Sequence, residues 1–253
     1  MADAGLTIEQ RGALLILTID RDERRNALDS MTSAALDAAI EGGERDPDIS
    51  VILLTATGER AFCSGMDMKE AAAIGPGSGL ISGRGFGGIT ERRRTKPLIA
   101  AINGAAVAGG FEIALACDIV IAADHATFAL AEVKRGMFAF AGGIQRLARM
   151  VPRQTALALI LTGEPITAAR MFELGLVSEV VPRGELRARA IALGETIAGY
   201  AQDGVRNAKL LHDLAADAAI DDSLRFGRAR GEATLGSDAV RTGIAAFAGA
   251  KKP

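Results

Sequence analysis

The sequence is poor in the residues on which several classes of protein depend. It contains no tryptophan, one tyrosine, two cysteines and two histidines among 253 residues. Cys63 and Cys117 form no CxxC pair, so a disulfide framework is not expected. His125 and His212 are too few and too far apart for a metal cluster, and neither accompanies a GxSxG motif. Metal-assisted and serine-nucleophile chemistry are therefore not expected.

Net charge and long apolar runs are also lacking. Lysine and arginine number 29 against 31 aspartate and glutamate residues, a net charge of −2, which gives no general attraction for nucleic acid or an anionic membrane. The first ten residues, MADAGLTIEQ, have neither a basic start nor an apolar core, and no run approaches the roughly 18 apolar residues of a membrane span. We expect a cytoplasmic protein with no membrane or nucleic-acid partner.

Periodicity predicts an α/β fold. Buried strands are expected at 14–19, 51–55, 98–102 and 118–122, alternating with helices at about 30–45, 64–73 and 109–116, and Ser30 is a plausible cap of the first helix. From about residue 185 the pattern is helical and alanine-rich, with Gly204, Gly227 and Gly236 as expected breaks. We expect an α/β core over 1–195 and a helical region over 196–253.

Two glutamates bracket the most informative stretch of the chain. Glu112 lies in the first turn of a helix that begins at Gly109-Gly110, and Glu132 follows twenty residues later. A glycine-rich helix start leaves backbone N–H groups unpaired and carries partial positive charge, so it can hold a carbonyl oxygen that gains negative charge. A second turn, Ser64-Gly65-Met66, follows another strand and could converge on the same oxygen.

Structural roles remain open for both glutamates at this level. A glutamate in the first turn of a helix commonly complements the helix dipole, which is the alternative for Glu112. Glu132 could lie in a solvated loop or form a salt bridge with Lys134 or Arg135.

A set of segments, in order over residues 10 to 252, carries a resemblance to a known family. They are DRDERRNALDS, ERAFCSGMDMKE, KPLIAAINGAAVAGGFEIALACDIVIA, FALAEVKRG, AGGIQRL, LTGEPITAARMFELGLVSEVVP and SDAVRTGIAAFAGAKKP. The sequence resembles the crotonase, or enoyl-CoA hydratase/isomerase, superfamily. The resemblance implies a crotonase-type fold with a repeated ββα core and a carboxy-terminal helical region.

By position, the resemblance implies that Glu112 and Glu132 are catalytic and that the N–H groups of Met66 and Gly109 form an oxyanion hole. In hydratases the two glutamates hold a water against the β-carbon while a proton reaches the α-carbon. Isomerases commonly need only the glutamate that matches Glu132, so the presence of both favours an enoyl-CoA hydratase. The alternatives are a double-bond isomerase and a non-catalytic acyl-CoA- or RNA-binding protein on the same fold.

The resemblance also implies the partners. The substrate is an acyl-CoA thioester in fatty acid metabolism, CoA is part of that substrate, and no separate cofactor is expected. Lys69 matches a family position near the CoA phosphates, and Lys251 lies in the tail that can reach a neighbouring site, although each could equally be a surface lysine without a ligand. A homotrimer or homohexamer is expected, with the helical region at subunit contacts.

The sequence departs from the hydratase pattern beside the expected active site. Where typical hydratases have an IPGAGG-like stretch, this chain has MFAFAGG at 137–143, so Phe138 and Phe140 are expected to narrow or reshape the acyl pocket. Ala108 replaces a glycine, and Phe111 lies beside Glu112 where small residues are common.

Two further motifs need interpretation. Residues 83–88, GRGFGG, fit the GxGxxG pattern but lack its strand-turn-helix setting, so we interpret 74–88 as a mobile loop at the mouth of the acyl pocket. Arg92-Arg93-Arg94 with Lys96 is the densest basic cluster. We interpret it as a solvated helix end or a subunit contact, with RNA binding as the minor alternative because interleaved aromatic residues are lacking.

Overall fold

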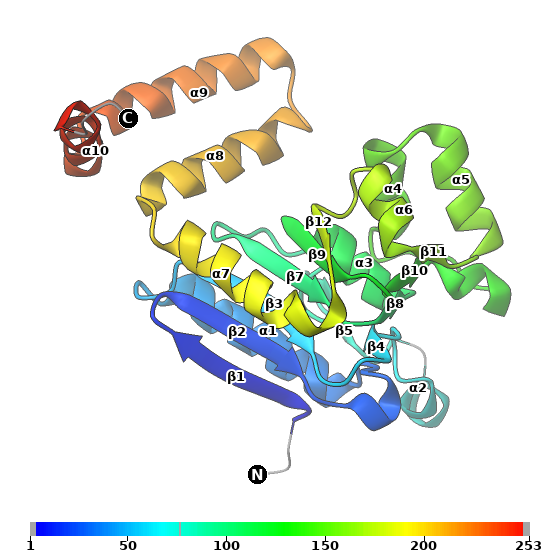
Figure 1. Cartoon of the computed structure of the whole chain (residues 1–253). Coiled ribbons are helices and arrows are strands. Elements are labelled where there is room, and N and C mark those ends of the chain that lie inside the picture. The colour runs from blue at the N-terminus through cyan, green and yellow to red at the C-terminus, as the bar shows by residue number, and fades with distance from the viewer. Residues whose placement is uncertain (1–3, 76, 250–253) are drawn as a thin grey trace. The chain divides into compact units, whose positions relative to one another are not determined.

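The predicted apolar runs lie together in one six-stranded sheet (Figure 1). The structure is a computed structural model that describes residues 4–75 and 77–249. The strand order is β1-β2-β3-β7-β9-β12, with β1 antiparallel to β2 and all other neighbours parallel. The strands are β1 (Leu6–Arg11), β2 (Leu14–Ile19), β3 (Val51–Ala56), β7 (Leu98–Ile102), β9 (Ile119–Ala123) and β12 (Glu179–Val181). The α/β prediction is confirmed, and the four predicted strands are correct to within one residue at either end.

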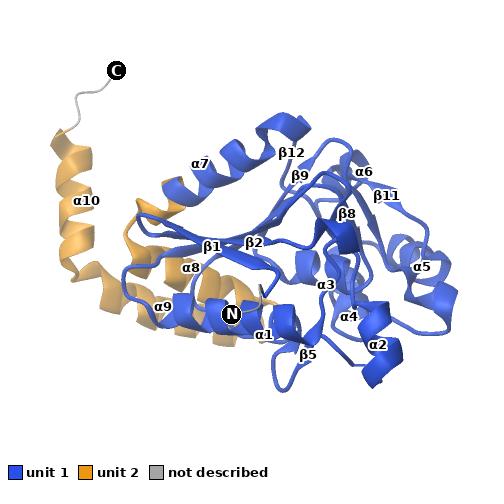
Figure 2. Cartoon of the chain, turned by 90° about the horizontal axis from the view of Figure 1, so that it is seen from below, with its two compact units in different colours: residues 1–195 blue, residues 196–253 orange. Residues whose placement is uncertain are grey.

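Strand β2 reads as a continuous apolar run because both of its faces are covered. Helices α1 (Ser30–Arg45) and α7 (Leu186–Ala198) lie on opposite sides of this part of the sheet (Figure 2). A Cβ built on Gly194 of α7 would lie 2.7 Å from Leu14, and one built on Gly43 of α1 would lie 2.7 Å from Leu15. Adjacent residues of β2 therefore pack against different helices, each at a glycine.

The predicted cap of α1 is off by one residue. Asp29 is the cap, because its backbone is extended and its carboxylate accepts a 2.8 Å hydrogen bond from the Thr32 N–H. Ser30 is the first helical residue. Aspartate and serine are both good caps, so the local sequence did not decide between them.

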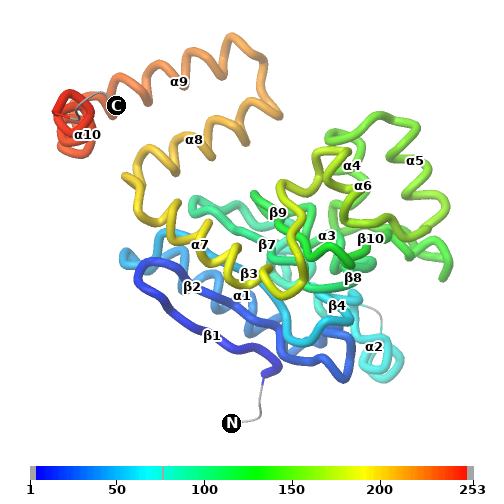
Figure 3. Tube along the Cα trace, viewed as in Figure 1, coloured from blue at the N-terminus to red at the C-terminus, as the bar shows by residue number. Residues whose placement is uncertain are grey.

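A second sheet brings two turns of the chain together. Its order is β11-β10-β8-β4, from β4 (Ala61–Cys63), β8 (Ala105–Val107), β10 (Thr127–Ala129) and β11 (Ile166–Thr167). Strands β4 and β8 are parallel neighbours, and the trace in Figure 3 shows them side by side although they are far apart in sequence. The turn after β4 therefore lies beside the start of α3 (Gly109–Ala116). The two turns are therefore neighbours, and their convergence on one oxygen stays a prediction.

Other elements complete the first unit. Helix α2 (Met68–Ile74) starts later than predicted because Asp67 caps it and 64–67 form the preceding turn. The remaining elements are η1 (Asp22–Arg24), β5 (Leu80–Ile81), β6 (Gly85–Phe86), η2 (Ala131–Arg135), α4 (Gly143–Met150), α5 (Arg153–Thr162), α6 (Ala168–Glu173) and η3 (Arg183–Glu185).

The GxGxxG segment is a small hairpin, so the prediction of a loop with few backbone contacts is wrong. Strands β5 and β6 pair antiparallel, and the Gly87 N–H donates to the Gly79 carbonyl at 2.8 Å. Arg84 adds a bidentate hydrogen bond to Asp37 of α1 at 2.9 and 3.0 Å. The strand pairing is local, but the contact with Asp37 is tertiary and could not be predicted from the local sequence. Residue 76 of the predicted loop lies outside the described residues.

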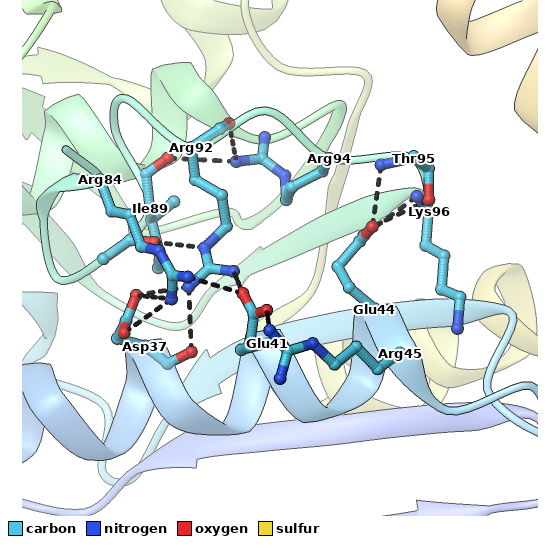
Figure 4. Close-up of polar contacts among 11 residues, drawn as sticks. Asp37, Glu41, Glu44, Arg45, Arg84, Ile89, Arg92, Arg94, Thr95 and Lys96 are labelled. Atoms are coloured by element: carbon cyan, nitrogen blue, oxygen red, sulfur yellow. Dashed lines mark hydrogen bonds and ion pairs between the residues drawn. The ribbon is translucent and has the colours of Figure 1, made fainter.

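The basic cluster is turned inward and does not lie on a helix, so the prediction of a solvated helix end is wrong. The Arg92 guanidinium donates to Asp37 and, at 2.7 Å, to Glu41, and Figure 4 shows both carboxylates rising from α1. Lys96 is buried, and its ammonium donates to the carbonyls of Gly43 and Asp46 at 2.6 and 2.5 Å. Lys96 thus satisfies carbonyls that the end of α1 leaves free.

Arg94 also bonds within the fold. Its guanidinium donates to the carbonyls of Ile89 and Ala116, while the neighbouring Arg93 is exposed. Three of the four cations are therefore engaged with α1, α3 and the adjoining loop, and they do not form a basic surface of the kind that RNA binding requires.

The second unit comprises Thr196–Pro253, and its described residues, orange in Figure 2, are largely helical. Its helices are α8 (Gln202–Ala215), α9 (Ile220–Leu235) and α10 (Asp238–Gly249). Gly236 ends α9 as predicted, but Gly204 and Gly227 lie inside helices. A Cβ on Gly227 would touch Leu211 of α8 at 3.4 Å, so this glycine lies where α8 and α9 pack together. None of the described helices is long and apolar enough to span a membrane.

Candidate active site

One cavity of about 530 Å³ in the first unit collects the predicted site residues. It is lined by parts of η1, the turn after β4, the hairpin, the start of α3 and the segment after β10. The predicted residues that line it are Met66, Lys69, Gly109, Glu112, Glu132, Phe138 and Phe140. Lys251 lies outside the described residues. All predicted site residues that the structure describes are therefore brought together.

Close packing explains the glycine pair at the start of α3. A Cβ on Gly109 would lie 2.6 Å from the Phe86 ring, and one on Gly110 would lie 2.0 Å from the Cys63 carbonyl oxygen. Ala108, just before the helix, has φ 53° and ψ −125°, a conformation that L-residues rarely adopt. The Gly109 N–H opens the helix and so has no partner within it. It is available to a ligand oxygen.

The backbone around Met66 provides a second N–H group. The Leu28 N–H donates to the Gly65 carbonyl and the Asp67 N–H donates to the Leu28 carbonyl, both at 2.9 Å. In such a parallel bridge the middle residue, Met66, directs its own N–H away from the paired strand. A Cβ on Gly65 would lie 3.3 Å from the Gly109 nitrogen. The N–H groups of Met66 and Gly109 thus belong to two touching turns of one cavity wall.

Glu112 is held in a defined position although it is almost fully buried. Its side chain is 3% exposed, and Oε1 accepts a 2.9 Å hydrogen bond from the N–H of Gly143, the first residue of α4. A Cβ on Gly143 would lie 3.0 Å from the Glu112 Cγ, so the close approach favours glycine there. The pKa of Glu112 is raised to about 7, mainly by burial; the Gly143 N–H opposes this rise and the charge of Glu132 adds to it.

Glu132 is buried as well and has a free oxygen. It is 8% exposed, and its Oε2 has no hydrogen-bond partner among the residues that the structure describes. Burial raises the pKa of Glu132 above its usual value. Lys134 instead pairs with Glu164 at 2.7 Å, so the predicted alternative of a bridge to Lys134 is wrong. An unsatisfied buried carboxylate oxygen is costly, and its position in a cavity wall indicates a functional role.

The arginines that line the cavity were missed from the sequence. Arg24, Arg25 and Arg135 all line it and are exposed, as is Lys69. Arg25 and Asn26 have φ values of 53° and 54°, and the buried Asn26 amide donates to two carbonyls at 2.9 and 2.7 Å. Asparagine tolerates this left-handed conformation better than most residues. The Arg-Asn pair was therefore the feature of the sequence that could have indicated a tight turn here.

The lysine ammonium is a flexible donor and the arginine guanidinium groups are forked donors, so together they can bind the several oxygens of a polyphosphate. Within residues 4–75 and 77–249, no group of three or more histidine, cysteine or acidic side chains could hold a metal ion.

Comparison with known proteins shows the family of the chain. Residues 9–253 match the family model described as enoyl-CoA hydratase/isomerase. A probable mitochondrial enoyl-CoA hydratase of Dictyostelium discoideum is 34% identical over 98% of this chain and 89% of that protein. A carnitinyl-CoA dehydratase of Salmonella arizonae is 35% identical over 98% and 97%. The crystal structure of an enoyl-CoA hydratase from Mycobacterium tuberculosis H37Rv superposes with a TM-score of 0.92 at 37% identity, covering 99% of this chain and 98% of that one. The chain therefore belongs to the enoyl-CoA hydratase/isomerase, or crotonase, family.

Proposed function

We propose that this protein is an enoyl-CoA hydratase that adds water across the 2,3 double bond of an enoyl-CoA thioester. The observation that carries the proposal is the pair of buried carboxyl groups, Glu112 and Glu132, in the wall of the same cavity as two available backbone N–H groups. Hydration needs the carboxyl groups because one proton must leave water and one must reach carbon. It needs the N–H groups because the thioester oxygen carries negative charge between these two steps.

In the proposed reaction, a water oxygen bonds to C3 of the thioester and a proton bonds to C2. One glutamate accepts the proton that water loses, and the other supplies the proton for C2. The N–H groups of Met66 and Gly109 hold the thioester oxygen while it carries negative charge. The charge of Glu132 raises the pKa of Glu112, which favours a pair that holds one proton and one negative charge.

The CoA part of the substrate is assigned to the cationic rim of the cavity. Arg24, Arg25 and Lys69 are exposed there and can meet phosphate groups. We propose Lys251 as a further phosphate contact on the basis of the family resemblance alone, and no cofactor is needed beyond the CoA of the substrate.

Glutamine variants test this proposal. Glutamine keeps the size of glutamate but cannot exchange protons, so E112Q and E132Q should each lower the turnover of 2-enoyl-CoA by roughly 10²- to 10⁴-fold. The measurement is the loss of the conjugated thioester absorbance. The matched control is E185Q, because Glu185 is exposed in η3 and does not line the cavity. Wild-type turnover in both E112Q and E132Q would overturn the proposal.

The same variants separate hydration from isomerisation. The free Oε2 of Glu132 could by itself move a proton between two carbons, which is all that a double-bond shift requires. If E112Q still isomerises a 3-enoyl-CoA while E132Q is inactive, the protein is an isomerase and the hydratase proposal fails.

A further inference from the structure

We propose that the acyl pocket selects aryl-substituted enoyl thioesters, and that Phe138 and Phe140 determine this selectivity. The inference rests on the proposed function and names the substrate class for that site. It starts from the composition of the cavity wall, which contains three of the nine phenylalanines and three of the seven methionines of the chain.

The two phenylalanines form an open aromatic pair. Their ring centroids are 6.0 Å apart with an interplanar angle of 71°, an edge-to-face arrangement. Both rings line the cavity, yet they remain 61% and 54% exposed. Aromatic rings prefer edge-to-face or offset neighbours, so a third ring can add to this pair in the same geometry. The exposed ring pair in the cavity wall is thus a preformed binding site for a flat aromatic group.

The segment that carries this pair connects the surroundings of the two glutamates. Residues 137–141 connect η2, which carries Glu132, to Gly143, which holds Glu112. Along this segment Ala139 and Ala141 are buried, while Phe138 and Phe140, which alternate with them, are exposed. Both rings therefore project from the same side of the segment. Glu132 lies just before this segment, and Gly143, just after it, donates a hydrogen bond to Glu112.

Methionines extend the apolar wall. Met66, Met68 and Met137 line the cavity together with the buried ring of Phe86. Thioether sulfurs are polarisable and make favourable contacts with ring edges. Met66 also carries the backbone N–H assigned to the oxyanion hole, so this wall continues toward the thioester position.

An aryl group gains more from this wall than a saturated group of equal size. Both bury similar apolar area, but the aryl group adds an aromatic pair, worth about 0.5–1.5 kcal/mol. That energy corresponds to an advantage of about 2- to 10-fold in kcat/KM. The advantage should disappear when the rings are replaced by leucine, which keeps an apolar wall.

The test compares 3-phenylpropenoyl-CoA with 3-cyclohexylpropenoyl-CoA, which match in size and differ in aromaticity. For each protein, the kcat/KM of the phenyl substrate is divided by that of the cyclohexyl substrate. The measured quantity is this ratio in the wild type divided by the same ratio in F138L or F140L. This quotient cancels the different intrinsic reactivity of the two thioesters. We expect a quotient of about 2 to 10. The control is F172L, since Phe172 is similarly exposed in α6 but does not line the cavity, and its quotient should be one.

A quotient of one in both F138L and F140L overturns the inference, while hydration of crotonyl-CoA by the wild type would leave the proposed function intact. Absence of hydration of every enoyl-CoA by the wild type contradicts the proposed function instead. Calorimetric binding of the unreactive 3-phenylpropionyl-CoA and 3-cyclohexylpropionyl-CoA to the wild type decides the question if a variant does not fold. Equal affinities would also overturn the inference.

Discussion

Glu112 links the burial of a single side chain to the stability of the protein. Its pKa is about 7, against an ordinary 4.5. Between these pH values the folded protein binds more protons than the unfolded chain, so folding stability falls as pH rises from about 4.5 to 7. At about 1.4 kcal/mol per pKa unit, the loss is at most about 3 kcal/mol.

E112Q removes this ionisation and should therefore gain stability relative to the wild type as pH rises. We expect the difference in unfolding free energy, measured by denaturant titration at pH 4, 6 and 8, to shift in favour of the variant by up to about 3 kcal/mol. A difference that stays constant across the three pH values would show that Glu112 has an ordinary pKa.

Arg146 acts on Glu112 at a distance. Its guanidinium donates to the Thr90 carbonyl at 2.5 Å and lies against Gly142, where a Cβ would meet Nη1 at 2.1 Å. Its positive charge lowers the pKa of Glu112. R146M should therefore raise that pKa and move the basic limb of the kcat/KM profile, where Glu112 loses its proton, to higher pH by less than about one unit. The control is R153M, at an exposed position that starts α5. An unmoved limb would contradict this positioning role.

The functional role of a single residue could be predicted from the sequence where residues adjacent to it in the chain form part of the site. Glu112 stands out because Gly109-Gly110 precede it, and the close packing of both glycines explains that pair. Arg24 and Arg135 were missed because only the fold brings them to the cavity. The burial of Glu132 could not be predicted either, since the nearby Lys134 and Arg135 are equally typical of a solvated segment.

At the scale of elements, helix α1 offers a matched pair of glycines. Nothing lies within 4 Å of a Cβ built on Gly42, whereas one on Gly43 would lie 2.7 Å from Leu15 and 3.2 Å from Ile52. G42A should stabilise the protein by about 0.5–1 kcal/mol, because alanine is the better helix former. G43A should destabilise it by about 1–3 kcal/mol through overpacking. Thermal unfolding checks both, and equal effects would contradict the packing of α1 on the sheet.

Elements with continuous burial were predicted well, and elements defined by tertiary contacts were not. Strands β2, β3, β7 and β9 are long apolar runs that a sequence displays directly. The strands of the second sheet have only two or three residues each, too few for a periodic pattern. The hairpin at 80–86 and the inward basic cluster depend on Asp37 and Glu41 of α1, which are distant in sequence.

At the scale of the whole molecule, the second unit lacks a core of its own. Among its described residues Ser223 alone is buried, while apolar side chains are exposed on α9 and α10: Ile220, Leu224, Leu235, Ile244 and Phe247. Such apolar surface is typical of subunit contacts. We therefore keep the prediction of a trimer or hexamer.

Sedimentation in dilute buffer tests the oligomeric state. The wild type should sediment as a trimer or hexamer, and F247E should weaken the assembly because Phe247 is 86% exposed. R241E, a charge change on the same helix at an exposed position, separates the loss of the apolar contact from a general effect of charge. A wild type that sediments as an active monomer would contradict the prediction.

Hydration itself is tested most directly by the fate of solvent oxygen. The wild type is incubated with a 2-enoyl-CoA in water enriched in oxygen-18, and the product is analysed by mass spectrometry. We predict a 3-hydroxyacyl-CoA that carries one labelled oxygen, formed roughly 10²- to 10⁴-fold more slowly by E112Q and by E132Q, with a double variant that loses less than the product of the two effects. A wild type that shifts the double bond without incorporating label, or variants that incorporate it at the wild-type rate, would contradict the assignment.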